Sequence, residues 1–235
     1  MNLRKAKVIW EGTKAGWPIC AGYFPAGLAF GVAAQKVGLS PVEIGLMSLL
    51  VFAGSTQFVA VSMLGSGTGI GPIVLTTFTI NLRHVLMSSA LAPYLSKLRR
   101  SWIFLFAYGV TDESFAVNAS RFRSGDWDWR KAIIVNHVSN LSWVGSSILG
   151  GYVGEFVPSN AFGIDYALKA MLICLVAMQM RNRYFFIVFV ISGVLAIIFC
   201  LVLPGNGYII VASMTGATLG LVLRRDWKED FRSGK

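Results

Sequence analysis

Long apolar stretches, separated by short polar or glycine-rich turns, dominate the pattern along the chain. No residue is formally charged between Lys14 and Lys36, and none from Ile44 to Leu82. Such runs exceed the roughly 20 apolar residues that a helix needs to cross about 30 Å of hydrocarbon. The pattern predicts helical segments at 15–36, 44–64, 70–95, 101–119, 132–154, 166–181, 184–203 and 207–223. The expected fold class is therefore an all-α polytopic membrane protein with seven or eight transmembrane helices.

Composition agrees with this class. Hydrophobic residues make up 55% of the 235 residues and charged residues only 14%, against roughly 25% charged residues in a soluble domain. The net charge of +10 comes from Lys and Arg residues that gather at segment ends. That placement is typical of charges that orient a protein in the bilayer and contact anionic membrane lipids, not of a nucleic-acid-binding surface.

Basic groups predict the orientation. Those near 4–14, 121–131, 181–183 and 224–228 should face the cytoplasm, including the N-terminus, and eight crossings satisfy all four. The basic residues of 97–100 do not fit eight crossings. Either segment 101–119 does not cross completely, or an earlier segment re-enters and the count is seven.

The expected organisation is a cytoplasmic segment 1–14, a first membrane half 15–120, a basic loop 121–131, a second half 132–224 and a tail 225–235. A cleavable signal is the alternative for the start, although the many later spans favour a retained helix.

The two halves show signs of an internal duplication. Adding 122 or 123 to positions of the first half finds matching residues in the second, namely Gly27 with Gly150, Gly31 with Gly154 and Gln57 with Gln179. The glycine pairs predict small-residue helix faces where backbones approach closely. Repeated halves that meet at a central site are the usual architecture of secondary transporters.

Arg83, Asp112 and Glu113 stand inside apolar segments. A charge near the middle of a spanning helix costs about 2.5–3.5 kcal/mol on insertion scales, so it requires a partner, a hydrated cavity or a function. A purely structural pairing of Arg83 with one acid is one interpretation. Because adjacent residues point about 100° apart on a helix, the other interpretation is that one acid holds Arg83 while its neighbour exchanges protons.

Other polar residues leave alternatives open. His84 is either a proton relay or a neutral, hydrogen-bonded core histidine, since Arg83 disfavours its protonation. Gln57 and Gln179 either bind substrate or bridge helices, and Pro25 either breaks its helix or only kinks it. With His84 and His137 as the only histidines, and with unpaired cysteines in apolar runs, neither a metal site nor a cofactor is expected.

Three blocks carry a family resemblance: GLSPVEIGLMSLLVFAGSTQFVAV (38–61), INLRHVLMSSALAPYL (80–95) and TDESFAV (111–117). They resemble the signature blocks of the AzlC family of branched-chain amino acid exporters. The resemblance implies a bacterial inner-membrane carrier that works with a small AzlD-type membrane protein. It also implies export of valine, leucine, isoleucine and often methionine, driven by proton entry.

The residues then take provisional roles. Arg83 and Asn81 would hold the substrate carboxylate, Asp112 or Glu113 would exchange protons with His84 nearby, and a helix break near Pro25 would offer backbone groups. The alternatives are a membrane-embedded enzyme that uses a histidine with Asp112, a channel, or a scaffold subunit that does not transport. The absence of a nucleophile or metal constellation in the sequence argues against an enzyme.

Overall fold

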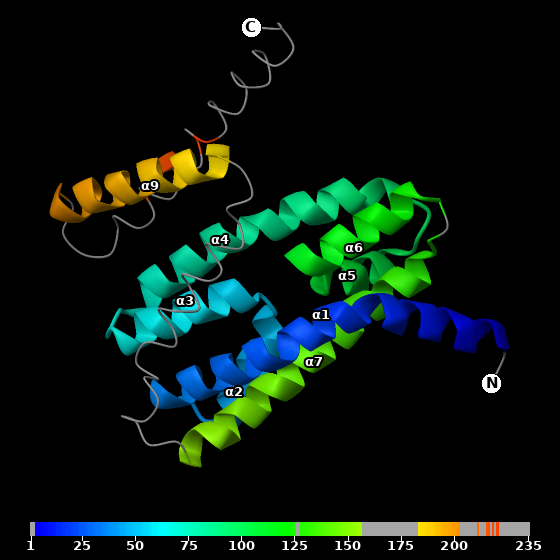
Figure 1. Cartoon of the computed structure of the whole chain (residues 1–235), viewed down its shortest axis with the longest axis horizontal. Helices are drawn as coiled ribbons and strands as arrows, with labels where there is room; N and C mark the ends of the chain where they lie inside the picture. The colour runs from blue at the N-terminus through cyan, green and yellow to red at the C-terminus, as the bar shows by residue number, and fades with distance from the viewer. Residues whose placement is uncertain are drawn as a thin grey trace, which may run out of the picture.

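The computed structural model describes residues 3–125, 127–156 and 183–202, with isolated positions at 211, 215, 216, 218 and 220. All regular structure in these residues is helical, as predicted (Figure 1). The elements are α1 (Leu3–Lys36), α2 (Pro41–Val51), α3 (Gly54–Gly65), α4 (Ile70–Leu91), the 3₁₀ turn η1 (Ala92–Leu95), α5 (Arg100–Tyr108), α6 (Asp112–Arg123), α7 (Trp129–Phe156) and α9 (Arg183–Val202). Predicted segment 166–181, with Gln179, lies outside the described residues, as does most of 207–223.

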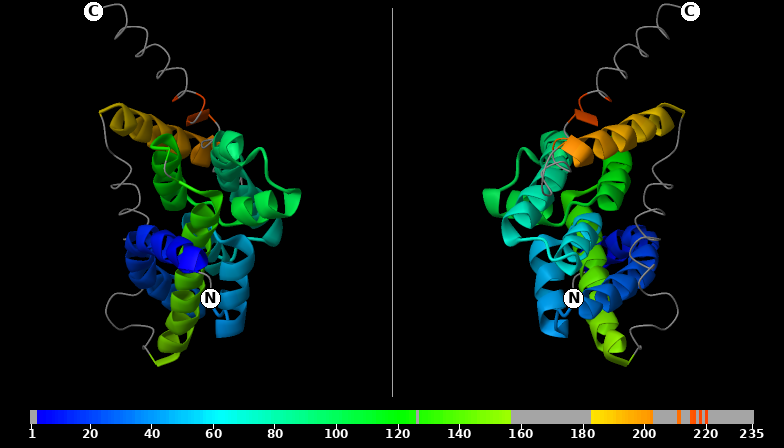
Figure 2. Two further views of the ribbon diagram at one scale, coloured as in Figure 1. Left: turned by 90° about the vertical axis from the view of Figure 1, so that its right-hand side faces the viewer. Right: turned by 90° about the vertical axis from the view of Figure 1, so that its left-hand side faces the viewer.

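Helices α1 and α7 run parallel and form the closest helix contact of this region (Figures 1 and 2). The hydroxyl of Ser142 donates to the Cys20 carbonyl at 3.1 Å, and the Lys36 amine donates to the Gly154 carbonyl at 2.8 Å. Between these points, a Cβ added to Gly31 would lie only 2.6 Å from the backbone nitrogen of Gly151. The small-residue faces predicted from the sequence are therefore confirmed for this helix pair.

Helices α2 and α3 form a hairpin, called here the first hairpin (41–65), that enters and leaves at one end of the helix pair. Its two ends lie near the C-terminal ends of α1 and α7, with Gly65 against Val37 and Pro41 against Gly151. Its tip lies about midway along these helices, where Gly54 contacts the Trp143 ring. The turn is possible because Phe52 adopts a left-handed conformation, with φ 39° and ψ 51°. The prediction of one continuous segment over 44–64 is therefore wrong.

Helices α5 and α6 form the second hairpin (100–123), interrupted at 109–111. Both of its ends lie at the N-terminal end of α7 and beside η1. The Trp102 ring lies 5.2 Å from that of Trp129, and Phe122 stacks on Tyr94 at 4.8 Å. Helix α5 has nine residues, about 14 Å of helix, which is too short to cross the bilayer. Segment 101–119 is therefore not one spanning helix, and Asp112 and Glu113 open α6 instead of lying in mid-helix.

The two hairpins enter from opposite ends and their tips meet. Helix α4 runs from the end of the first hairpin to η1, just before the second. At the tips, the Tyr108 hydroxyl donates to the Leu49 carbonyl, and the Phe52 and Tyr108 rings lie 6.3 Å apart. Helix α1 with the first hairpin and α4 with the second hairpin therefore form an inverted pair. This relationship lies within residues 3–123 and has a shorter period than the predicted duplication, whose later part lies largely outside the described residues.

Two described helical stretches have the length and apolar composition to cross a membrane, Lys5–Lys36 and Ile70–Leu95. The seven or eight crossings expected from the sequence are not established by the part of the chain that the structure describes. Helix α1 also continues through Pro25 without interruption, so the break predicted there is absent. The interruptions lie at the hairpin tips because left-handed Phe52 and the extended N-cap Thr111 cannot continue an α-helix.

Candidate functional site

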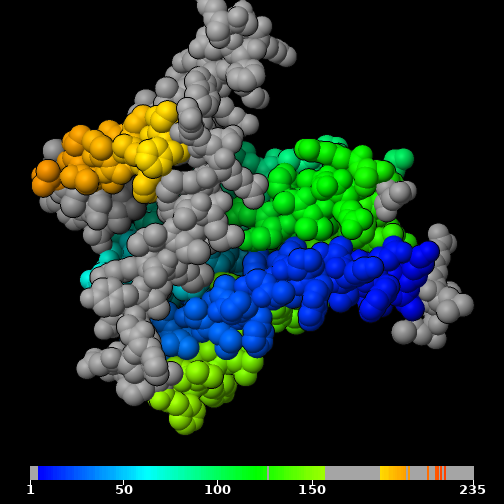
Figure 3. All heavy atoms as spheres, in the orientation of Figure 1, coloured from blue at the N-terminus to red at the C-terminus, as the bar shows by residue number. Residues whose placement is uncertain are grey.

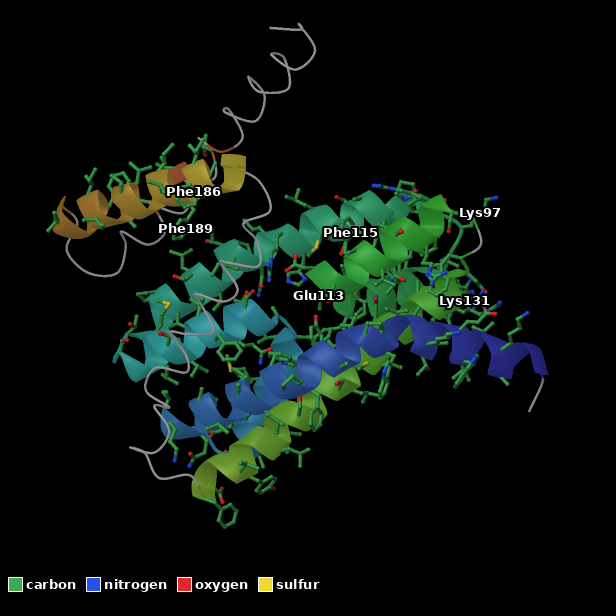
Figure 4. The ribbon with its side chains drawn as sticks, in the orientation of Figure 1. Lys97, Glu113, Phe115, Lys131, Phe186 and Phe189 are labelled. Carbon is green, nitrogen blue, oxygen red and sulfur yellow. The ribbon has the colours of Figure 1, made fainter. Side chains whose placement is uncertain are left out.

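Polar side chains gather where the hairpin tips meet α1 and α4, and we call this group the central polar cluster. Its members are Tyr23, Ser55, Thr56, Asn81, Arg83, His84, Thr111, Asp112 and Glu113. Figure 4 shows Glu113 at the end of α6 that faces the middle of the molecule, whereas Lys97, before α5, and Lys131, in α7, lie toward the opposite end of this hairpin. The fold thus separates the basic side chains at the open end of the second hairpin from the acidic side chains at its tip.

Arg83 connects the two hairpins. Its Nη1 lies 2.6 Å from Asp112 Oδ2 in α6, and its Nη2 donates to the Ser55 hydroxyl in α3 at 2.6 Å. The Arg83 side chain is 30% exposed and that of Asp112 is 50% exposed, so the pair is reachable by a ligand without unfolding. The planar guanidinium suits this role because it presents several donors in a fixed geometry.

The neighbouring carboxylate points elsewhere, as helix geometry predicts. Glu113 Oε2 lies 2.6 Å from the Tyr23 hydroxyl of α1, and the same hydroxyl lies 2.8 Å from Thr111 Oγ1. A hydroxyl carries one proton, so Tyr23 donates to the carboxylate and accepts from Thr111. Asp112 pairs with Arg83, whereas Glu113 forms no ion pair among the described residues. The two acids therefore point to different partners, as predicted, while the proton-exchange role of the second acid stays a prediction.

Asn81 and His84 contact the tips from α4. Asn81 accepts from the Thr56 hydroxyl at 2.7 Å, and His84 Nδ1 lies 2.8 Å from the Val110 carbonyl oxygen. Because a carbonyl can only accept, His84 Nδ1 carries a proton. Buried Arg83 Nε and His84 Nε2 have no hydrogen-bond partner in the part of the chain that is described. The cluster therefore contains two buried nitrogens whose hydrogen-bonding capacity the described residues do not use.

Not every predicted residue reaches the cluster. Gln57 is fully buried, with its amide nitrogen 3.2 Å from the Ser48 hydroxyl and its oxygen accepting from Trp143 at 3.0 Å. It bridges α2, α3 and α7. Pro25 lies exposed on the uninterrupted α1, and Gln179 lies outside the described residues.

Four members of the cluster were missed from the sequence: Tyr23, Ser55, Thr56 and Thr111. Thr111 could have been found, because it begins a Thr-Asp-Glu-Ser sequence typical of a helix N-terminus. The structure shows a capping box there, with the Thr111 amide 2.9 Å from the Ser114 hydroxyl. Tyr23 carries no such signal, since one tyrosine in an apolar helix most often packs in the core.

The cluster combines a cation, two carboxylates and two helix N-termini. Helices α3 and α6 both begin at the hairpin tips, so the positive ends of their dipoles are directed to the centre. Such a set can hold a small molecule that carries both charges. Among the described residues there is no group of three histidine, cysteine or acidic side chains that could hold a metal ion.

Two apolar helices long enough to span a bilayer, with a charged centre between inward-facing hairpins, are the features of a helical membrane protein. A family model described as AzlC protein matches residues 18–157, which include both hairpins and the whole cluster. The chain belongs to the AzlC family.

The relatives agree with this assignment. Inner membrane protein YgaZ of Escherichia coli is 32% identical over 69% of this chain and 67% of its own length. The branched-chain amino acid transport protein AzlC of Bacillus subtilis is 27% identical over 95% of this chain and 90% of its own. A membrane protein of Archaeoglobus fulgidus is 29% identical over 93% of this chain and 96% of its own. No solved structure matches the chain.

Proposed function

We propose that the chain is a secondary transporter that exports branched-chain amino acids across the bacterial inner membrane by proton antiport, together with a small AzlD-type subunit. The observation that carries the proposal is the pairing of Arg83 with Asp112 where the two hairpin tips meet, beside a Glu113 that forms no ion pair among the described residues. The name of the Bacillus subtilis relative supports the substrate class.

The cluster offers one partner for each charge of an amino acid. The substrate carboxylate binds at Arg83 and the N-terminus of α3, where the Ser55 hydroxyl already lies 2.6 Å from the guanidinium. Asn81 assists from the same helix as Arg83. The substrate ammonium group binds at Glu113. Valine, leucine and isoleucine bind with similar affinity, because one methylene contributes only about 0.8 kcal/mol.

Competition at Glu113 provides the coupling. The ionised carboxylate attracts the substrate ammonium group, whereas the protonated carboxylate does not. Binding of a proton on one side of the membrane therefore favours release of the amino acid there. Asp112 is less suited to this role, because its carboxylate already pairs with Arg83 at 2.6 Å.

A returning second hairpin also explains the basic residues of 97–100, which did not fit eight crossings. Because the hairpin returns to the end where it started, Lys97, Arg99 and Arg100 lie at the same end as Arg121 and Arg123. All of them then face the cytoplasm together with the N-terminal end of α1, as the distribution of positive charge in inner-membrane proteins favours.

Transport by proteoliposomes that contain the chain and its AzlD-type partner tests the proposal. Vesicles loaded with unlabelled leucine should exchange it for labelled leucine, and an imposed pH gradient should drive accumulation. Glu113→Gln should keep leucine exchange at a reduced rate but lose the response to the gradient. Glu43→Gln, the same substitution at the exposed base of the first hairpin, is the matched control and should retain both.

Two outcomes would contradict the proposal. One is the absence of saturable leucine exchange. The other is a response to the pH gradient that survives both Glu113→Gln and Asp112→Asn.

A further inference from the structure

Tyr23 contacts both hairpin tips from a third element. Its hydroxyl lies 2.6 Å from Glu113 and 2.8 Å from Thr111 in the second hairpin. Its ring lies 6.4 Å from Phe52, at the tip of the first hairpin, with the two planes 82° apart. The ring also lies 5.5 Å from that of Trp143 in α7. Tyr23 therefore joins a titratable group of one hairpin to the packed tip of the other.

We propose that Tyr23 is a positioning residue that couples the protonation of Glu113 to the attachment of the second hairpin to α1. This inference rests on the proposed function, since it assigns Glu113 the proton-exchange role. It adds that the proton is sensed through the Tyr23 hydroxyl, and that α1 is the element against which the second hairpin moves.

The physical basis is the difference between two hydrogen bonds. An ionised Glu113 accepts a charge-assisted hydrogen bond from the Tyr23 hydroxyl, which is about twice as strong as a hydrogen bond between neutral groups. When Glu113 takes a proton from water, this charge assistance is lost. Thr111, whose hydroxyl donates to Tyr23, is the N-cap of α6, and its Oγ1 accepts a hydrogen bond from the Ser114 amide at 3.3 Å. Weaker hydrogen bonds of Tyr23 therefore loosen the turn of the second hairpin, which lies at Thr111.

The other titratable and charged groups near Glu113 have their own partners. Asp112 precedes it on α6 and is paired with Arg83 of α4. His84, also on α4, contacts the Val110 carbonyl beside the hairpin turn. None of these contacts involves the Tyr23 hydroxyl. A change in the titration of Glu113 on removal of that hydroxyl can then be assigned to Tyr23.

The test is the pH dependence of leucine exchange by Tyr23→Phe, in the complete complex in proteoliposomes. This substitution removes the hydroxyl and keeps the ring contacts with Phe52 and Trp143. Loss of a donor to the ionised carboxylate raises the pH at which Glu113 binds a proton, by about one unit for a charge-assisted bond. The midpoint of the exchange profile should move to higher pH by that amount.

Tyr108→Phe is the matched control, because the Tyr108 hydroxyl also links the two hairpins but donates to a backbone carbonyl, Leu49 O. It should leave the midpoint unchanged. In the double variant Tyr23→Phe/Glu113→Gln, the pH profile of leucine exchange should lack the transition that belongs to Glu113.

A second measurement does not depend on the folding of Tyr23→Phe. Amide hydrogen exchange over 109–115, corrected for its intrinsic pH dependence, should increase in the native complex as the pH falls through the midpoint. It should be independent of pH in Glu113→Gln.

The failures are distinguishable. Without a pH-dependent exchange in the native complex, the proposed function fails. If the native complex shows such exchange but Tyr23→Phe has the same midpoint, or if amide exchange over 109–115 ignores pH, the role of Tyr23 fails and the transporter proposal stands.

Discussion

At the scale of single residues, the energetics of the bilayer explain why Arg83 has so many neighbours. A lone guanidinium in hydrocarbon is unfavourable by several kcal/mol, whereas here two of its nitrogens contact Asp112 and Ser55. The contacts that offset the cost of burying the Arg83 charge also place this residue where the two hairpins meet. A residue that binds both tips is well placed to respond when a substrate carboxylate competes with Asp112.

Arg83→Lys should separate charge from geometry. The lysine ammonium keeps the charge but cannot reach Asp112, Ser55 and a ligand in one fixed arrangement. We expect the KM for leucine to rise roughly tenfold or more, the equivalent of one charge-assisted hydrogen bond, with a smaller change in maximal rate. Arg100→Lys, at the exposed start of α5, is the control and should behave as the native protein. An unchanged KM in Arg83→Lys would remove Arg83 from the carboxylate site.

At the scale of elements, the parallel contact between α1 and α7 provides the frame against which both hairpins pack. Gly31 lies directly on the backbone of α7, where an added Cβ would be 2.8 Å from the carbonyl carbon of Gly150. Close backbone contact replaces the hydrophobic effect as the source of helix association within a bilayer, because lipid is as apolar as a leucine side chain.

Gly31→Ala should therefore destabilise the protein, by about 1–3 kcal/mol if the helices can separate slightly. Gly22→Ala, on the same helix, is the matched control, because a Cβ added there would have no neighbouring atom within 4 Å. It should be neutral or slightly stabilising, since alanine is the better helix former. Thermal unfolding in detergent measures both. Equal melting temperatures for the two variants would show that α1 and α7 do not meet at Gly31.

At the scale of the molecule, the inverted pair of hairpins decides which parts of the chain share an end of the helix bundle. Figure 3 shows α1 running along one face with the second hairpin beside it. In this arrangement α1 and α4 run in opposite directions, and each hairpin returns to the end of the helix bundle from which it starts. In the proposed transporter, each side of the membrane would have one hairpin that leads to the charged centre, and movement of one inverted unit against the other would give alternating access.

Labelling of single cysteines in intact cells tests this topology, in a background without native cysteines. Arg100→Cys and Arg123→Cys mark the two ends of the second hairpin and should be labelled from the same side. Ser66→Cys, in the exposed turn after α3, should be labelled from the opposite side. Labelling of positions 100 and 123 from opposite sides would mean that α5 and α6 cross the membrane together.

The charged residues of the site could be predicted from the sequence more accurately than the bounds of the helices that carry them. Arg83, Asp112 and Glu113 stand out because charge in an apolar segment is costly, and that cost depends only on composition. The divergence of the two acids follows from the 100° step of the helix. Tyr23, Ser55 and Thr56 could not be found, because their importance comes from neighbours that lie far away along the chain.

The sequence by itself determined the class of the protein, its all-helical character, the close faces of Gly31 and Gly150, and the charged residues of the centre. These follow from local composition and from periods that one chain segment contains. Only the tertiary structure decided that 44–64 and 101–119 turn back at Phe52 and Thr111. Hydropathy measures how apolar a segment is, whereas the direction of a chain after a break depends on the contacts that its tip makes.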